Sequence, residues 1–443
     1  MLRVTVLLFF VSSIIFSQTE LNLKYCLDNA IKKNSEFIKL ANSIEAQEGN
    51  IKQSYGNLLP TLSLTTGWSR TNQVTGSGTN IGGITIPTPP QNQNYFNYTL
   101  GVRSDVLLFN GFANYDNIDL QKQNQAVLYT QMQKLEQDIA LKTIASYITV
   151  LKNLRVVKVN QATLADSRVQ YERVKAFVDV GKRSRVDLSR QDVVVAQNEL
   201  ALEQVNNQLS KAIIELASGS NLPLDKNYSV NEEQFFSDIS LDYMKKFYGD
   251  NSNLSRLTQV AASNRKDYKA SLQYLDVYST SLEITRSNLI FPTLSGYLSY
   301  NLSAPQIKNI TDSRIFTVGL SLSYPILQGF QVDNQRQQAE IKLLSANEDL
   351  KQMKRQIELD LKKVLLDMES LIKQMEITER TLKASELDKT LAEESYLAGL
   401  GTLLEFETAT TKHNNALIER SNQVYNFILA QKQLEYYQGI LKY

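Results

Sequence analysis

The feature that most constrains this chain is an internal repeat that covers nearly its whole length. Three landmarks of the first half recur in the same order in the second half. The landmark pairs are Pro60 and Pro292, Gly111 and Gly329, and Gly181 and Gly399. The two glycine pairs have the same spacing along the chain, whereas the two prolines are more widely spaced. The additional residues of the first half therefore lie between Pro60 and Gly111, where residues 75–90 have the Gly, Thr, Asn and Pro content of a loop.

Each half follows one predicted order of elements: a helical segment, two strands joined by a loop, a very long helix, a tight turn and a returning long helix. The predicted helices are 21–57, 112–180 and 184–218 in the first half, and 242–289, 330–398 and 402–438 in the second. We therefore divide the mature chain into a first repeat at 18–218, a linker at 219–241 and a second repeat at 242–443.

The long helices are predicted to be similar to those of coiled coils, because their apolar residues recur at steps of four and three. One such seam consists of Ile357, Leu361, Val364, Met368, Leu371 and Met375. A helix of about 70 residues measures roughly 100 Å at 1.5 Å per residue. A compact domain does not contain such a rod, and composition by itself would favour a fibrous coiled coil.

The predicted strands argue against a fibrous coiled coil. Residues 98–103 and 316–324 alternate apolar side chains with small or polar ones. This alternation is typical of membrane strands that have one face toward lipid and the other toward a lumen, although a soluble hairpin also alternates. Trp68 and Tyr300 fall at matching positions of the two repeats. A membrane–water interface would suit both rings.

Residues 1–17 are predicted to be a secretory signal, with Arg3 followed by an apolar run that is too short for a comfortable membrane span. The single Cys and single His exclude an internal disulfide framework and a metal site of paired Cys or His ligands. A net charge of +1 does not indicate a nucleic-acid partner. No nucleophile–base pair, phosphate loop or metal cluster is evident, so we expect neither catalytic residues nor a cofactor, and the chain is not predicted to be an enzyme.

The four predicted strands of one chain are too few to close a barrel. An open edge in lipid leaves N–H and C=O groups unpaired, and each unpaired group costs several kcal/mol. Membrane strands in this chain therefore require several copies, which symmetry arranges in a ring. Two copies would supply eight strands around an interior nearly filled by side chains, and three copies would supply twelve strands around a lumen.

At its junctions and turns the chain resembles the TolC family of outer-membrane efflux proteins, over essentially the whole mature sequence. The motifs are Leu59-Pro60 and Phe291-Pro292 before the first strand of each repeat, the segments 106–111 and 324–329 between strand and long helix, and the turns at 180–188 and 396–405. Their order and their duplication are specific, although each motif by itself is weak. Pro60, Gly111, Pro292, Pro325 and Gly329 are then interpreted as structural residues of the strand–helix junctions.

The resemblance implies a mixed α+β membrane protein. Three copies would form a 12-stranded β-barrel in the outer membrane, continuous with a long α-helical tunnel in the periplasm. Members of the family act together with a periplasmic adaptor protein and an inner-membrane transporter of the RND or ABC class. The implied function is a passive channel subunit in efflux or type I secretion.

The resemblance also places a gate at the turns near Gly181 and Gly399, which would form the periplasmic tip. Glu405 matches the first of two acidic positions that narrow the tunnel mouth in the family. The second acidic position falls at Thr408, and an arginine of the family's gate network falls at Gly401.

Tyr396 matches the tyrosine of the same network. Arg183, Arg185 and Asp187 on the neighbouring turn are candidates to replace the missing charges.

Two alternatives remain open from the sequence. Asp187 and Glu405 follow Ser184 and Thr402 by three residues, which also suits acids that cap a helix N-terminus. The whole chain also has a competing interpretation as a periplasmic coiled-coil adaptor or structural protein, although adaptors usually add a β-rich domain that this sequence does not show. Our hypothesis for Glu405 is a cation-selective constriction.

Overall fold

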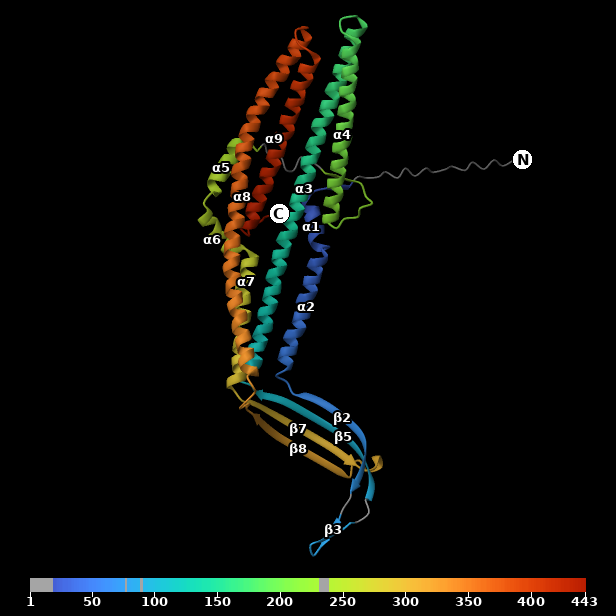
Figure 1. Ribbon diagram of the computed structural model, residues 1–443, viewed down its shortest axis with the longest axis vertical. Helices are drawn as coiled ribbons and strands as arrows, with labels where there is room; N and C mark the ends of the chain where they lie inside the picture. The colour runs from blue at the N-terminus through green and yellow to red at the C-terminus, as the bar shows by residue number, and fades with distance from the viewer. Residues whose placement is uncertain (1–18, 76–77, 88–90, 231–238) are drawn as a thin grey trace, which may run out of the picture. The chain divides into compact units, whose positions relative to one another are not determined.

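A computed structural model describes residues 19–75, 78–87, 91–230 and 239–443 of the chain (Figure 1). The predicted secretory signal at 1–17 therefore lies outside the described residues. The chain forms two compact units, and both repeats contribute to each. The sheet unit contains residues 42–129 and 270–350, and the helical unit contains the residues up to Ala41 together with 130–269 and 351–443.

Four long strands form the sheet of the sheet unit, in the order β2-β5-β7-β8 and with every neighbouring pair antiparallel (Figure 1). Their bounds are Thr61–Thr75 for β2, Gln91–Phe109 for β5, Thr293–Ala304 for β7 and Ser313–Ser323 for β8. A short hairpin of β3 (Gly78–Ile81) and β4 (Ile84–Pro87) lies in the connection between β2 and β5. The β5–β7 pairing joins the first repeat to the second.

The strand register collects most of the apolar side chains of the four strands on one face of the sheet. Leu64 lies opposite Val102, Val102 opposite Tyr300, and Tyr300 opposite Phe316. The other face is mostly polar and contains Ser63, Thr65, Thr99, Arg103, Ser299, Asn301, Thr317 and Ser321. The alternation predicted for each strand thus produces a single amphipathic sheet.

The two aromatic residues predicted at a membrane interface both lie on the apolar face. Trp68 is opposite Tyr98 and is 60% exposed. Tyr300 is opposite Phe316 and is 40% exposed. Their place at a membrane interface stays a prediction, because the chain alone does not locate a bilayer.

Two antiparallel hairpins of long helices supply most of the helical unit. Their helices are α3 (Ala113–Asp179), α4 (Arg185–Gly219), α8 (Gln331–Leu397) and α9 (Leu403–Tyr437). Each predicted bound of these helices agrees with the structure within one residue. The repeat is kept in their lengths, since α3 and α8 each have 67 residues and α4 and α9 each have 35. Within the described ranges, no helix is both long and apolar enough to cross a membrane.

The helical segment predicted at the start of each repeat is present but is not one continuous helix. The first segment divides into α1 (Leu23–Lys32) and α2 (Ser35–Gly56), and the second into α5 (Leu241–Asn251), α6 (Leu254–Asn264) and α7 (Lys266–Ile290). Two of the three breaks occur at asparagines whose side chains accept hydrogen bonds from backbone N–H groups. Asn34 accepts hydrogen bonds from the N–H groups of Glu36 and Phe37, and Asn253 caps α6 through the N–H of Arg256. Such local bonds offer the backbone an alternative to a continuous helix.

The core of the helical unit extends to its short strands. β1 (Thr19–Leu21) pairs in parallel with β6 (Tyr228–Val230), which lies in the predicted linker. Leu21 and Cys26 are completely buried near Tyr147 of α3, whose hydroxyl donates a hydrogen bond to the Leu21 carbonyl oxygen at 3.5 Å. Cys26 is therefore a packing residue of α1.

A buried ion pair is found at the start of α7. The Arg265 guanidinium is 2.6 Å from the Asp267 carboxylate and 3.1 Å from the carboxylate of Asp360 on α8. The turn after α9 packs closely against the backbone of this arginine. A Cβ atom added to Gly439, which has a φ of +73°, would lie 2.6 Å from the Arg265 backbone nitrogen. The arginine thus connects three segments that are far apart in the sequence.

Candidate functional site

The turns that end α3 and α8 have the same backbone conformation, and glycine makes it possible. Gly181 has a φ of +73° and Gly399 a φ of +79°, which is a left-handed conformation that glycine adopts without steric cost. The N–H of Lys182 bonds to the Phe177 carbonyl oxygen at 2.8 Å, and the N–H of Leu400 bonds to that of Ser395 at 3.0 Å. These bonds are those of the Schellman motif that terminates helices. The repeated glycines are thereby explained.

The two acidic residues after the turns cap the returning helices. The Asp187 N–H donates to the Ser184 hydroxyl at 3.2 Å, and the Asp187 carboxylate accepts from the Ser184 N–H. The same reciprocal pair links Glu405 and Thr402, where the Thr402 N–H donates to the Glu405 carboxylate at 2.8 Å. Hydrogen bonds from the backbone and side chain of Thr402 lower the pKa of Glu405. The capping role that the sequence left open is therefore present at both acids.

Tyr396 lies in a buried aromatic cluster at the tip of the helices. It is 1% exposed, and its ring stacks on Phe406 of α9 at a centroid distance of 6.1 Å. Arg183 of the first turn lies over the same ring, 4.5 Å from its centroid, and donates a hydrogen bond of 2.7 Å to the Tyr396 carbonyl oxygen. One side chain of the first hairpin therefore contacts the second hairpin directly. Burial raises the pKa of Tyr396, so its hydroxyl stays neutral.

The remaining predicted gate residues are less constrained. Arg185 is exposed at the first position of α4. Thr408 is exposed as well, and its hydroxyl donates to the Leu404 carbonyl oxygen at 2.7 Å. At Gly401 an added Cβ atom would lie 2.8 Å from the Ser395 hydroxyl, so the turn is too tight there for a larger side chain without a shift of Ser395. The structure thus gives a local reason for glycine at this position.

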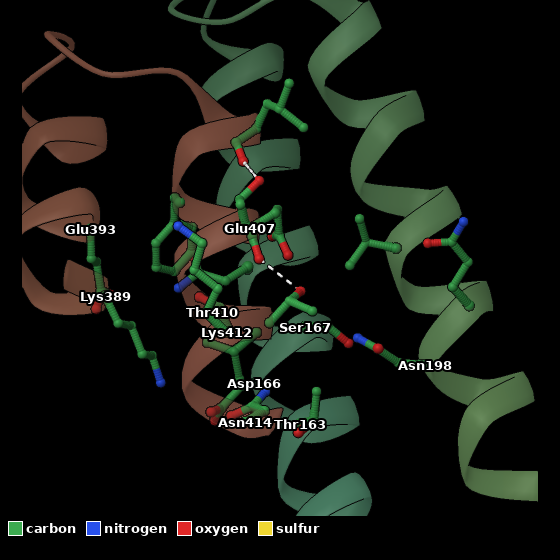
Figure 2. A pocket seen from close by; sticks show the side chains of 18 of the residues that line it. Thr163, Asp166, Ser167, Asn198, Lys389, Glu393, Glu407, Thr410, Lys412 and Asn414 are labelled. Atoms are coloured by element: carbon green, nitrogen blue, oxygen red, sulfur yellow. Dashed lines mark hydrogen bonds between the residues drawn. The ribbon is translucent and has the colours of Figure 1, made fainter. Parts of the chain in front are cut away.

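A cavity of about 620 Å³ lies just beyond the turns, between α3, α4, α8 and α9. Figure 2 shows Glu407 and Thr410 on α9, Ser167 on α3 and Asn198 on α4 around it. Charged side chains of both signs line the cavity: Asp166, Arg173, Lys389, Glu393, Glu407 and Lys412. In the part of the chain that the structure describes, no group of three or more His, Cys, Asp or Glu residues is placed to hold a metal ion.

Sequence reasoning missed Glu407, which is adjacent to the matched position of Thr408. Burial raises the pKa of Glu407, and a hydrogen bond from Gln191 opposes this effect. Gln191 is completely buried on α4, and its side-chain amide donates to the Ser167 carbonyl oxygen at 3.3 Å. The signal that could have identified Glu407 is its place on the face of α9 that contains Leu403 and Phe406, which are both buried.

Glu405 and Glu407 are expected to affect stability in opposite directions as the pH changes. Because the pKa of Glu407 is raised in the folded protein, Glu407 contributes to the stability of the fold at low pH. This contribution is lost as the pH rises through the raised pKa. The lowered pKa of Glu405 means that its contribution is present at neutral pH and is lost on acidification. We expect the Tm of Glu407→Gln to rise relative to the Tm of the wild type as the pH is raised from 4 to 8.

The matched control is Glu405→Gln, for which the Tm difference changes with the opposite sign over the same pH series. Both values are measured by circular dichroism of the helices in detergent. Parallel pH dependences for the two variants would contradict the prediction.

The strand–helix junctions of the two repeats are also alike. Gly111 and Gly329 both have positive φ values, of +68° and +54°. The phenylalanines that follow them, Phe112 and Phe330, have φ values of +67° and +65°. Pro60 and Pro292 directly precede β2 and β7, and Pro325 follows β8 after one residue. The five predicted junction residues therefore lie where the chain changes from strand to helix or from helix to strand.

Comparison with known proteins yields one family and relatives that extend over almost the whole chain. The model of a family described as outer membrane efflux protein matches residues 26–220 and 257–439. A curated relative, outer membrane protein TolC of Salmonella enteritidis, is 24% identical over 431 residues, which cover 96% of this chain and 83% of that protein.

Solved structures share the fold. The outer membrane protein VceC from Vibrio cholerae superimposes with a TM-score of 0.76 at 15% identity, covering 94% of this chain and 96% of that chain. The CmeC outer membrane channel of Campylobacter jejuni gives a TM-score of 0.74 at 14% identity, covering 94% of this chain and 85% of that chain.

Proposed function

Because this chain belongs to the outer membrane efflux protein family, we propose that it is the channel subunit of a tripartite efflux or type I secretion system. The family match confirms the predicted resemblance and the location in the outer membrane. At the level of the family, the chain is a channel protein and not an enzyme. In our proposal it conducts passively what an inner-membrane RND or ABC transporter delivers through a periplasmic adaptor.

The observation that carries the proposal is the amphipathic sheet, which has one apolar face and one polar face. Three copies of its four strands form a 12-stranded barrel with the apolar face toward outer-membrane lipid and the polar face toward a water-filled lumen. Two copies would supply only eight strands, and side chains would nearly fill the interior of such a barrel. A homotrimer therefore fits a conducting channel better than a dimer does.

The two repeats have corresponding roles in this channel. The first repeat at 18–218 and the second at 242–443 each contribute one strand pair to the barrel and one helical hairpin to the tunnel, and 219–241 connects them. Residues 1–17 direct export of the chain and are removed. Gly181 and Gly399 end the two hairpins at the periplasmic tip, and Trp68 and Tyr300 lie at the membrane interface.

We propose that the gate lies at the turns, which contain Tyr396, Gly401, Glu405 and Thr408 in one hairpin and Arg183, Arg185 and Asp187 in the other. The support is the direct contact of Arg183 with Tyr396 and the low pKa of Glu405. An ionised Glu405 from each of three subunits forms a ring of negative charge that attracts cations. The family's second acid is replaced by Thr408, so this ring is the main constriction in our proposal.

Replacing Glu405 with alanine is expected to change conduction. In planar bilayers the preference for cations over anions falls toward unity and the single-channel conductance changes, because the ring loses its charge. Glu405→Asp is the matched control, since it keeps the negative charge and an aspartate forms the same capping pair at the equivalent position of α4. Unchanged selectivity in Glu405→Ala, or an equal change in both variants, would exclude a selective ring at Glu405.

The tripartite function is tested in cells. Deletion of the gene is expected to sensitise the organism to a panel of toxic compounds, and expression of the chain in the outer membrane restores resistance only when the inner-membrane pump is present. Cross-linking from cysteines at exposed Arg185 is expected to capture the periplasmic adaptor. Full resistance in the deletion strain, together with no captured adaptor, would contradict the proposal.

A further inference from the structure

The internal repeat also holds for the register of the strands. In the first repeat Thr61 of β2 lies opposite Asp105 of β5. By the spacing of the two repeated prolines, the counterpart of Thr61 in the second repeat is Thr293. By the spacing of the repeated glycines, the counterpart of Asp105 is Ser323. Thr293 and Ser323 are a pair between β7 and β8. Positions in one repeat can therefore be transferred to the other, pair by pair.

A third pairing, between β5 and β7, shows how the end of one repeat meets the start of the next. Asp105 lies opposite Tyr297, and the pairing continues to Phe109 opposite Leu294. Beyond it, Phe291 packs against Gly111, where an added Cβ atom would be 2.7 Å from the Phe291 Cβ atom. The second strand of a repeat thus pairs with the first strand of the following repeat, and the two junctions fit together.

The second repeat has no such neighbour within the chain. β8 pairs only with β7, and β2 pairs only with β5, so each has one open edge among the described strands. β8 ends at Ser323, whereas its counterpart β5 continues to Phe109. The residues that follow β8 are highly exposed: Tyr324 at 54%, Ile326 at 91%, Leu327 at 90% and Phe330 at 86%.

We propose that β8 of one copy pairs with β2 of a second copy in the register that the internal repeat dictates. The proposal rests on the proposed assembly of several copies into one barrel. Each β5–β7 pair gives one β8–β2 pair between the copies. The glycine spacing relates the β5 residue to its counterpart in β8, and the proline spacing relates the β7 residue to its counterpart in β2. The transfer places Ser323 opposite Thr65 and Ser313 opposite Thr75 of the second copy. Every residue of β8 then has a partner within β2.

The same register completes the exposed segment after β8. Tyr324–Leu327 then lie opposite Leu62–Leu64 of the second copy, and the last transferred pair, which follows the bulge of the β5–β7 pairing, brings Leu327 to Leu62. Leu59 of that copy, which is 65% exposed, takes the place over Gly329 that Phe291 takes over Gly111. The strand–helix junction of the second repeat is incomplete without these residues of the partner copy.

This register also satisfies the two faces of the sheet. It places Leu320 beside Trp68 on the apolar face and Ser321 beside Gly67 on the polar face. A slip of one residue would exchange the faces and put polar side chains into lipid. A slip of two residues would keep the faces but would move Leu59 away from Gly329. The proposed register is the one that retains both features.

Disulfide trapping in the outer membrane tests the register directly. The full-length chain carries Cys26→Ala, so that the introduced cysteines are the only ones. The in-register variant combines Thr65→Cys with Ser323→Cys. Directly opposite residues of antiparallel strands have Cα atoms about 4.5–5.5 Å apart, which a disulfide can bridge. The slipped controls are Thr65→Cys with Ser321→Cys and Ser63→Cys with Ser323→Cys, whose diagonal separation of about 7–8 Å is too long.

On mild oxidation and non-reducing electrophoresis, the in-register variant is expected to form covalent oligomers at least about tenfold faster than either slipped control. Faster linking of a slipped control would overturn the register while leaving the assembly intact. Absence of linking in a protein that still migrates as an oligomer without oxidation would show that these edges do not meet. A chain that stays monomeric in the membrane would overturn the proposed function as well.

Discussion

Replacement of Arg265 with alanine is expected to lower the free energy of unfolding of the helical unit by about 3–5 kcal/mol, because it removes the cation that two largely buried carboxylates share. The guanidinium is 8% exposed and bridges carboxylates that are 18% and 15% exposed, those of Asp267 and Asp360. Urea titration followed by helical circular dichroism measures the loss.

The matched control is Arg168→Ala, which breaks an ion pair of similar length. Arg168 is 2.7 Å from Glu199, but the side chains are 60% and 50% exposed. Solvent screens such a pair, so the expected loss is below about 1 kcal/mol. Equal losses in the two variants would show that burial of Arg265 contributes nothing.

Acidification is expected to reproduce part of the effect in the wild-type protein. Burial by itself would raise the pKa of Asp267, but the hydrogen bonds and positive charge of Arg265 outweigh burial and lower this pKa. A carboxyl group with a lowered pKa stabilises the fold above its unfolded pKa, and this contribution is lost as the pH falls through the folded pKa. The Arg265→Ala variant is expected to lose less stability than the wild type between pH 5 and pH 3.

The second large effect is expected at Gly111. Valine at this position must adopt a φ of +68°, which costs about 1–2 kcal/mol, and its Cβ atom collides with the Phe291 side chain. Overpacking of this kind adds about 1–3 kcal/mol. We therefore expect Gly111→Val to destabilise the sheet unit severely, as measured by limited proteolysis of the outer-membrane fraction and by the yield of folded protein.

Gly329→Val separates backbone strain from collision. The φ of Gly329 is also positive, at +54°, but nothing lies within 4 Å of an added Cβ atom in the single chain. The variant chain is expected to fold with a loss limited to the strain of about 1–2 kcal/mol. If Leu59 of a second copy covers this glycine, the same variant also lowers the temperature at which oligomers dissociate in detergent. Identical behaviour of the two variants would contradict the packing of Phe291 on Gly111.

The long helices and their turns were predictable because the interactions that define them are local. The Schellman turns at Gly181 and Gly399 and the capping pairs Ser184–Asp187 and Thr402–Glu405 each involve residues at most five positions apart. The same type of interaction also explains the main error. Asn34 and Asn253 bond to nearby N–H groups, and these caps divide helices whose apolar pattern continues across the break.

The candidate gate was only partly predictable. The sequence pointed to Arg183 and Tyr396 separately, as members of two similar turns. Their contact joins residues 213 positions apart, and the stacking of Tyr396 on Phe406 accompanies it. Glu407 was missed because the family pattern drew attention to Glu405 and Thr408, and its hydrogen bond with Gln191 joins α9 to the distant helix α4.

By itself, the sequence determined the duplication, the bounds of the four long helices, the turns and the alternation of the strands, since each depends on residues within a few positions or on comparison of the two halves. The tertiary structure decided the order β2-β5-β7-β8, which places most apolar strand residues on one face. It also decided the burial of Arg265 and the contact between the two turns. These features depend on how segments hundreds of residues apart pack together, and alternation or helical periodicity within one segment carries no information about its partner.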